Sequence, residues 1–164
     1  MSDNRIVLEI PPTGSRTTTE EPKSSSVDVA IGALFLILIL PVIALSMREL
    51  ADVADSLEYG ADMIDIVNSM IYSLTTVSIL LVLGLYFLGA IKSRVTKVAS
   101  GLTLIFLSLV NVLCRVGDFS RELQRNGEWG WDGSLFEHLS WPSTHERIEL
   151  ALVGAIVGLL IMKK

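Results

Sequence analysis

The sequence predicts an all-α membrane protein, a four-helix transmembrane bundle with both chain ends on the cytoplasmic side. Three observations predict it: long apolar segments nearly free of charge, basic residues gathered in one short connection and at the C-terminus, and acidic residues gathered in the other connections. Apolar residues make up 51% of the 164 residues, a share that soluble domains also approach. The class is therefore decided by their grouping into segments long enough to cross a bilayer.

The N-terminal residues 1–27 are predicted to form a disordered cytoplasmic tail. They are rich in Ser, Thr, Pro and Glu, with hydroxyl runs at Thr17–Thr19 and Ser24–Ser26. Such a segment buries too little apolar surface to offset the entropy lost on ordering. A plain flexible tail is favoured over a phosphorylated one. The transmembrane domain then comprises residues 28–164.

Four apolar segments are predicted to cross the membrane, at about residues 29–47, 69–91, 98–116 and 145–162. The first would rise ~28 Å as a helix, close to the thickness of the hydrocarbon layer. Pro41 lies inside it and predicts a kink. The stretch 70–91 has no charged residue and is apolar all round, whereas a helix of a soluble protein needs a polar face.

The fourth segment reaches spanning length only if its helix starts ahead of Ile148. Ser143 followed by Glu146, directly after Pro142, fits a capping box and predicts a helix that begins near Thr144.

The distribution of charge predicts the orientation. The inner connection 92–97 holds Lys92, Arg94 and Lys97 and no acidic residue, and the chain closes on Lys163 and Lys164. Basic residues of short loops stay in the cytoplasm, so this connection and the C-terminus are predicted to be cytoplasmic. An even number of spans puts both chain ends on the same side, so the four predicted spans place the N-terminus in the cytoplasm too. The outer loops 48–68 and 117–144 are acidic overall.

The first outer loop has the periodicity of a helix. Apolar residues from Leu50 to Ile71 recur at threes and fours with acidic residues between them. We expect helices 1 and 2 to extend outside the bilayer as an antiparallel hairpin that turns near Tyr59–Gly60. The acidic residues are then a solvated face, which is favoured over a docking site for cations or a basic partner.

The second outer loop predicts two short helices around a turn at Asn126–Gly127. Ser134 with Glu137 fits a second capping box, which opens a helix over Leu135–Leu139. This helix lies either on the membrane surface or as a cap over the bundle, and the sequence leaves both open. The tryptophans of this loop, Trp129, Trp131 and Trp141, suit an interfacial aromatic belt.

Polar groups within the spans are the main candidates for function, because they are costly there. Arg115 and Glu149 are expected at similar depth, and we predict an ion pair between them with Asn111 one turn below Arg115. A structural clasp is favoured over a selectivity element at a pore mouth. Other polar side chains of helices two and three include Thr75, Thr76, Ser78, Thr103 and Ser108.

Gly154 and Gly158 match the small-xxx-small pattern that lets two helix backbones approach closely. They predict contact with other membrane proteins, with a second copy of the chain, or with a helix of the same chain. Gly32, Ala33, Gly84 and Gly89 offer further small contacts.

No catalytic, cofactor-binding or metal site is predicted. Cys114 is the single cysteine and is expected to be a small buried hydrophobe. His138 and His145 are expected to be surface histidines, since no paired ligand spacing accompanies them. A net charge of −5 argues against nucleic acid, which binds basic surfaces.

We therefore expect a non-catalytic accessory or scaffold subunit of a membrane assembly, in contact with the lipid bilayer. The alternative is a small oligomeric ion channel or transporter subunit, with a path lined by Asn111, Arg115, Glu149 and the hydroxyl groups of helix two. A membrane enzyme that uses outer-loop residues is a weaker third hypothesis.

Overall fold

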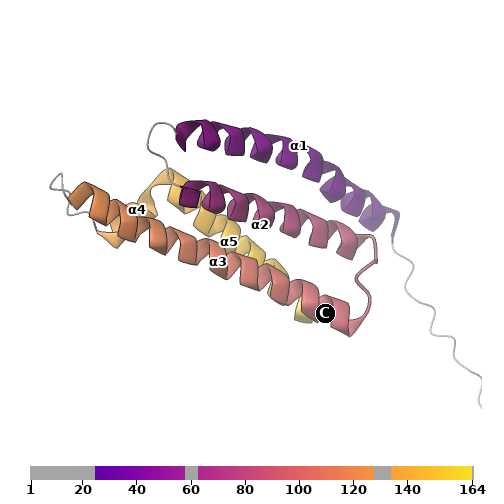
Figure 1. Cartoon of the computed structure of the whole chain (residues 1–164). Helices are drawn as coiled ribbons and strands as arrows, with labels where there is room; N and C mark the ends of the chain where they lie inside the picture. The colour runs from indigo at the N-terminus through magenta and orange to yellow at the C-terminus, as the bar shows by residue number, and fades with distance from the viewer. Residues whose placement is uncertain (1–24, 58–62, 128–133, 164) are drawn as a thin grey trace, which may run out of the picture.

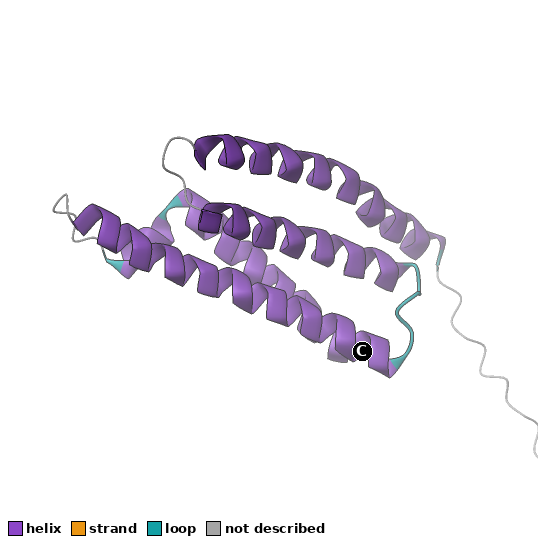
Figure 2. Cartoon of the chain, viewed as in Figure 1, coloured by secondary structure: helices purple, strands orange, loops and turns teal. Residues whose placement is uncertain are grey.

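The computed structural model describes residues 25–57, 63–127 and 134–163, and within them the regular structure is helical. The prediction of an all-α protein is confirmed. The described residues form four long helices and one short one, drawn in Figures 1 and 2. They are α1 (Ser26–Ser56), α2 (Met63–Phe87), α3 (Arg94–Gly127), α4 (Leu135–Ser140) and α5 (Pro142–Lys163).

Three of these helices are long and apolar enough to cross a membrane: α1, α2 and residues 94–121 of α3. The membrane class is thereby supported. The predicted fourth span lies on α5, which has 22 residues and is thus ~33 Å long. Its first turns carry Glu146, Arg147 and Glu149, so its apolar stretch is shorter than those of the other three. Whether it crosses the membrane stays a prediction.

The four long helices lie side by side and alternate in direction (Figure 1). At one end, here called the α4 end, α1 and α3 finish while α2 and α5 begin. At the other, the termini end, α1 begins and α5 finishes. The most extensive contacts join α3 to α5 and α1 to α2, and α2 also contacts α3 and α5. The helix α1 is therefore peripheral, with α2 as its main neighbour.

The start of α1 is fixed by a capping box just ahead of the predicted span. The Ser25 hydroxyl accepts from the backbone N–H groups of Val27 (3.1 Å) and Asp28 (3.4 Å), and the Asp28 carboxylate accepts from the Ser25 N–H at 3.2 Å. The helix then continues through Pro41 to Ser56. Figure 1 shows it bowed along its length.

Both helices of the predicted outer hairpin are longer than the predicted spans. The helix α1 reaches Ser56 and α2 starts at Met63, so both helices continue beyond the predicted spans at this end. Their extension outside the bilayer as a hairpin stays a prediction. The expected turn at Tyr59–Gly60 and most of the predicted tail 1–27 lie outside the described residues.

The helix α3 runs to Gly127, eleven residues past the predicted end of the third span. The helix ends at the predicted turn signal Asn126–Gly127, and the first of the two short helices expected in this loop is the continuous end of α3 rather than a separate helix. The physical reason is the composition after Val116, where Arg, Glu, Leu and Gln favour continued helix and no proline interrupts it. Trp129 and Trp131 lie outside the described residues.

The helix α4 begins as predicted, because the Glu137 N–H donates to the Ser134 hydroxyl at 3.2 Å. The start of α5 differs from the prediction. The carbonyl of Trp141 accepts from the N–H groups of Thr144 (3.0 Å) and His145 (2.9 Å), so the helix begins at Pro142. Proline suits this first position because its missing N–H would have no helical partner there.

The helix therefore starts two residues ahead of the position near Thr144 that Ser143 and Glu146 predicted. Ser143 lies within the first turn of α5 rather than ahead of it.

Glycines set the close approach of two helix pairs. A Cβ atom on Gly158 of α5 would lie 2.6 Å from the carbonyl oxygen of Gly101 on α3, and the reverse distance is the same. A Cβ on Gly154 would collide with the Ser108 hydroxyl of α3. The small-residue face of Gly154 and Gly158 is thus used inside the chain, against α3.

The second pair is α1 with α2, near the termini end. A Cβ on Gly32 would lie 2.9 Å from the carbonyl oxygen of Gly84, and one on Gly84 would lie 2.6 Å from the Leu36 side chain. Two backbones that approach this closely gain van der Waals contact, which stabilises helix pairs in lipid.

The contact between α3 and α5 yields a first prediction. Gly158→Ala places a methyl group against the Gly101 backbone, which cannot turn aside, so we expect a loss of about 1–3 kcal/mol in the free energy of unfolding. Gly117→Ala is the matched control on α3, because nothing lies within 4 Å of its added Cβ. It should be neutral or stabilise by about 0.5–1 kcal/mol. Reversible unfolding in mixed detergent micelles measures both, and equal effects would contradict the packing described.

Candidate functional site

The interior of the bundle is polar toward the α4 end and apolar toward the termini end. On α2 the buried residues change from Asn68 to Thr75 to Ile79, and on α3 they change from Asn111 to Ser108 to Leu104. The buried polar side chains are Asn68, Ser69, Thr75, Ser108, Asn111, His138 and Thr144, and the large buried apolar ones are Ile79, Ile91, Leu104 and Ile161. Chemistry or binding therefore has its best setting at the α4 end.

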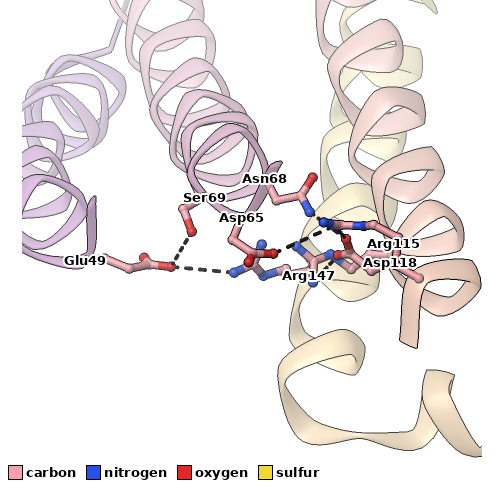
Figure 3. A network of polar contacts seen from close by, with 8 residues as sticks. Glu49, Asp65, Asn68, Ser69, Arg115, Asp118 and Arg147 are labelled. Carbon is pink, nitrogen blue, oxygen red and sulfur yellow. Dashed lines mark hydrogen bonds and ion pairs between the residues drawn. The ribbon is translucent and has the colours of Figure 1, made fainter. Parts of the chain in front are cut away.

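A cluster of charged and polar side chains occupies this end (Figure 3). Each of the four long helices contributes to it. We call it the polar cluster, and it consists of Glu49 from α1, Asp65, Asn68 and Ser69 from α2, Arg115, Asp118 and Arg121 from α3, and Arg147 from α5.

Asp118 is the centre of the cluster. Its Oδ1 accepts a hydrogen bond from the Asn68 side-chain amide at 2.7 Å and also contacts Arg121. Its Oδ2 pairs with Nη1 of Arg115 at 2.9 Å. The Asp118 and Arg115 side chains are only 13% and 11% exposed. Asp118 therefore ties α2 to α3 and neutralises an arginine that is largely withdrawn from solvent.

Glu49 plays the corresponding part for α1. Its Oε1 accepts from the Ser69 hydroxyl at 3.3 Å and lies 3.5 Å from Nη2 of Arg147. The Arg147 guanidinium also lies over the Tyr72 ring, 5.0 Å from its centroid, where the π face attracts a cation. Glu49 thus connects the peripheral helix α1 to both α2 and α5.

The charges of the cluster balance. The cations Arg115, Arg121 and Arg147 are matched by Asp118, Asp65 and Glu49, with Arg121 lying 3.7 Å from Asp65. Withdrawing a charge from water is costly, and an opposite charge with good geometry is needed to offset that cost. The arrangement therefore fixes how the helices meet at this end.

The predicted pair of Arg115 with Glu149 is wrong. Arg115 pairs with Asp118, while Glu149 is 63% exposed and lies 3.0 Å from His145 on its own helix. Glu149 follows Arg147 by two residues, about 200° around the helix, so only one of them can face the bundle. Arg147 takes that place. Asn111 lies one helical turn before Arg115, as predicted, and it is buried.

Two sequence signals could have found the cluster. Asp118 follows Arg115 by three positions and so shares its helix face. Asn68 and Ser69 begin the apolar part of α2, where polar groups need a partner.

Three threonine hydroxyl groups of the spans bond to the backbone of their own helices. Thr75, Thr76 and Thr103 donate to the backbone carbonyls four residues before them, at 2.7, 3.1 and 2.9 Å. None of these three lines the polar cluster. The channel hypothesis assigned three hydroxyl groups of helix two to a conducting path. Two of them, those of Thr75 and Thr76, donate instead to backbone carbonyls of their own helix.

His138 differs from the prediction of a surface histidine, since it is only 3% exposed. Its ring contacts those of Phe119 and Trp141, with centroid distances of 5.5 and 5.0 Å. This happens because α4 packs against α5 and turns His138 inward while Phe136 is exposed. His145 does lie at the surface, as expected. Within residues 25–57, 63–127 and 134–163, no group of three or more His, Cys, Asp or Glu side chains is placed to hold a metal ion.

No family model, curated protein or solved structure matches this chain. The functional interpretation therefore depends on the polar cluster and on the faces that the helices leave exposed.

The cluster yields a second prediction. Asp118→Asn keeps the shape of the side chain but leaves Arg115 without its counter-charge, so we expect a loss of about 3 kcal/mol in the free energy of unfolding. Glu149→Gln is the control, because its contact with His145 is exposed and worth at most about 0.5 kcal/mol. Both are measured by unfolding in mixed micelles. A loss below 1 kcal/mol for Asp118→Asn would show that the cluster does not hold the bundle.

Proposed function

We propose that this protein is a non-catalytic multi-pass membrane protein that serves as an accessory or scaffold subunit of a membrane assembly. The observation that carries the proposal is the exposure of α1. Only 6% of its most apolar 18-residue stretch is buried, against 22% for α2 and for α3. The helix leaves most of its surface open to lipid or to a partner helix.

One stripe of α1 is especially open. Ile37, Leu40 and Met47 are 63%, 71% and 63% exposed, and their spacing puts them on one side of the helix. Glu49 holds α1 near its end, and the glycine contact of Gly32 holds it near its start. A rigidly held apolar stripe suits association with a partner's transmembrane helix, which is driven by close packing in lipid.

The proposal includes a fourth span by α5 and cytoplasmic chain ends. The helix α5 lies along α3 and antiparallel to it (Figure 1), so its apolar part occupies the same depth. Lys92, Arg94 and Lys97 lie around the start of α3 and Lys163 lies at the end of α5, so they belong to the termini end, which favours the cytoplasm for that end. The hairpin of α1 and α2 and the polar cluster would then face outward.

The interior supports a scaffold rather than the alternative channel or transporter subunit. The polar side chains gather at the α4 end in balanced ion pairs, while Leu104, Ile79 and Ile161 fill the described interior toward the termini end. A conducting path would have to form between copies of the chain rather than through one bundle.

The topology has a direct test in single-cysteine variants of a Cys114→Ala background. With both ends cytoplasmic, Ser93→Cys and Lys163→Cys should resist a membrane-impermeant maleimide in intact cells and react after permeabilisation. Asp55→Cys, on the exposed end of α1, should react in intact cells. Labelling of Lys163→Cys alone would show that α5 does not cross, and labelling of Ser93→Cys would overturn the orientation.

The partner surface is tested by truncating the exposed stripe. We expect Ile37→Ala, Leu40→Ala and Met47→Ala together to reduce crosslinking to co-purifying membrane proteins by at least about tenfold, the equivalent of 1.4 kcal/mol. The matched control is Leu102→Ala, Phe106→Ala and Leu109→Ala, a similarly exposed stripe on α3. Equal crosslinking of both triple variants, or a wild-type chain that captures only itself, would contradict the proposal.

A further inference from the structure

One face of α3 carries a regular line of exposed side chains. Its positions follow one another at alternating steps of four and three residues along nearly the whole helix. We call this line the α3 stripe, and it consists of Val95, Ala99, Leu102, Phe106, Leu109, Leu113, Val116, Ser120 and Leu123. All of these residues are exposed and none of them carries a charge.

The spacing of the α3 stripe is that of a coiled-coil seam. Alternating steps of four and three residues average 3.5, and a seam kept over three or four heptads is typical of two helices that wind around each other with a left-handed twist. The α3 stripe runs from position 95 to position 123, which is four heptads. Such a pattern predicts a partner helix with the same repeat.

The contacts of α3 inside the chain use the opposite side of the helix. Leu104 and Asn111 are buried, and each precedes a residue of the stripe, Phe106 and Leu113, by two positions. Two positions correspond to about 200° around a helix. The packing of α3 against α5 and α2 therefore leaves the stripe uncovered.

Lipid can cover only part of the stripe. From Val95 to Leu123 it rises ~42 Å, whereas the hydrocarbon layer of a membrane is about 30 Å thick. Val116 directly follows Arg115, and Leu123 lies two turns beyond it, yet they are 47% and 40% exposed. At this end the stripe continues past the apolar part of α3, and a protein partner removes its apolar surface from water.

The area of the stripe is large enough for a stable dimer. Val95 is 78% exposed, and the other six large apolar residues of the stripe are between 40% and 64% exposed. Together they leave roughly 700 Å² open, close to the ~800 Å² that each partner contributes to a stable interface.

We propose that two copies of the chain associate through the α3 stripe, as a parallel and left-handed pair of α3 helices. Copies inserted with the same topology carry α3 in the same direction, so a twofold axis along the pair brings each position opposite itself. An uncharged apolar stripe is complementary to itself in that arrangement. This inference goes beyond the scaffold role and uses a different helix from the partner contact of α1.

Disulfide crosslinking of the full chain tests the register. Single-cysteine variants of the Cys114→Ala chain are reconstituted in phosphatidylcholine vesicles and oxidised with copper phenanthroline. Ala99→Cys and Ser120→Cys should form covalent dimers, because the stripe brings their Cα atoms within the ~7 Å that a disulfide spans. Gly117→Cys is the matched control. It is also exposed, nothing lies within 4 Å of its added Cβ, and it lies to one side of the stripe, so its crosslinking should be at least about tenfold slower.

Energy transfer measures the association itself. Copies labelled with a donor or an acceptor at Ser93→Cys, again in the Cys114→Ala chain, are reconstituted together and diluted stepwise with lipid. We expect the combined substitutions Leu102→Ala, Phe106→Ala and Leu109→Ala to raise the dissociation constant at least about tenfold.

The α1 variant is the control for this measurement. Ile37→Ala, Leu40→Ala and Met47→Ala together should leave the dissociation constant of the dimer unchanged, while they reduce the capture of other membrane proteins. The two triple variants thus separate a failure of this inference from a failure of the scaffold role. Equal crosslinking at positions 117 and 120, no energy transfer between wild-type copies, or an unchanged constant for the α3 variant would overturn the inference and leave lipid as the cover of the stripe.

Discussion

The pairing of arginines with carboxylates at the α4 end is the constraint on which the rest of the structure depends. Arg115 and Arg147 are mostly buried beside apolar helices, and a charge in such surroundings is tolerated only with a partner. Asp118 and Glu49 are those partners, and they come with Asn68 and Ser69 of α2. Because the members lie on four helices, satisfying the charges also sets the register of the helices against one another.

Different interactions stabilise the two ends of the helix assembly. Toward the termini end, close glycine contacts join α1 to α2 and α3 to α5 through van der Waals packing. At the α4 end, directed hydrogen bonds and ion pairs cross between those two helix pairs. The glycines bring helices close within each pair, and the polar cluster connects the pairs. The peripheral α1 is thereby oriented while most of its surface stays exposed, which is the condition that a docking helix needs.

Much of the fold could be predicted from the sequence, because long uncharged apolar segments have few other structures available. The helical extension of α1 and α2 and the capped start of α4 also followed from local patterns. The continuity of α3 past Val116 did not, although the helix ends at the Asn126–Gly127 turn signal. The sequence predicted a structural clasp around Arg115, but the predicted partner of Arg115, Glu149, was wrong. Arg115 pairs with Asp118 because Glu149 faces away from the interior. Which face of α5 is turned inward depends on how α5 packs against α3, and the sequence does not show that.

The central claim is that Asp118 couples helices that are far apart in the sequence. A double-mutant cycle on Asn68→Ala and Asp118→Ala, measured by reversible unfolding in mixed micelles, tests it most directly. The two residues belong to α2 and α3 and are joined by a 2.7 Å hydrogen bond to a carboxylate. The account predicts a coupling free energy of about 1–2 kcal/mol. Effects that add to within about 0.5 kcal/mol would contradict it.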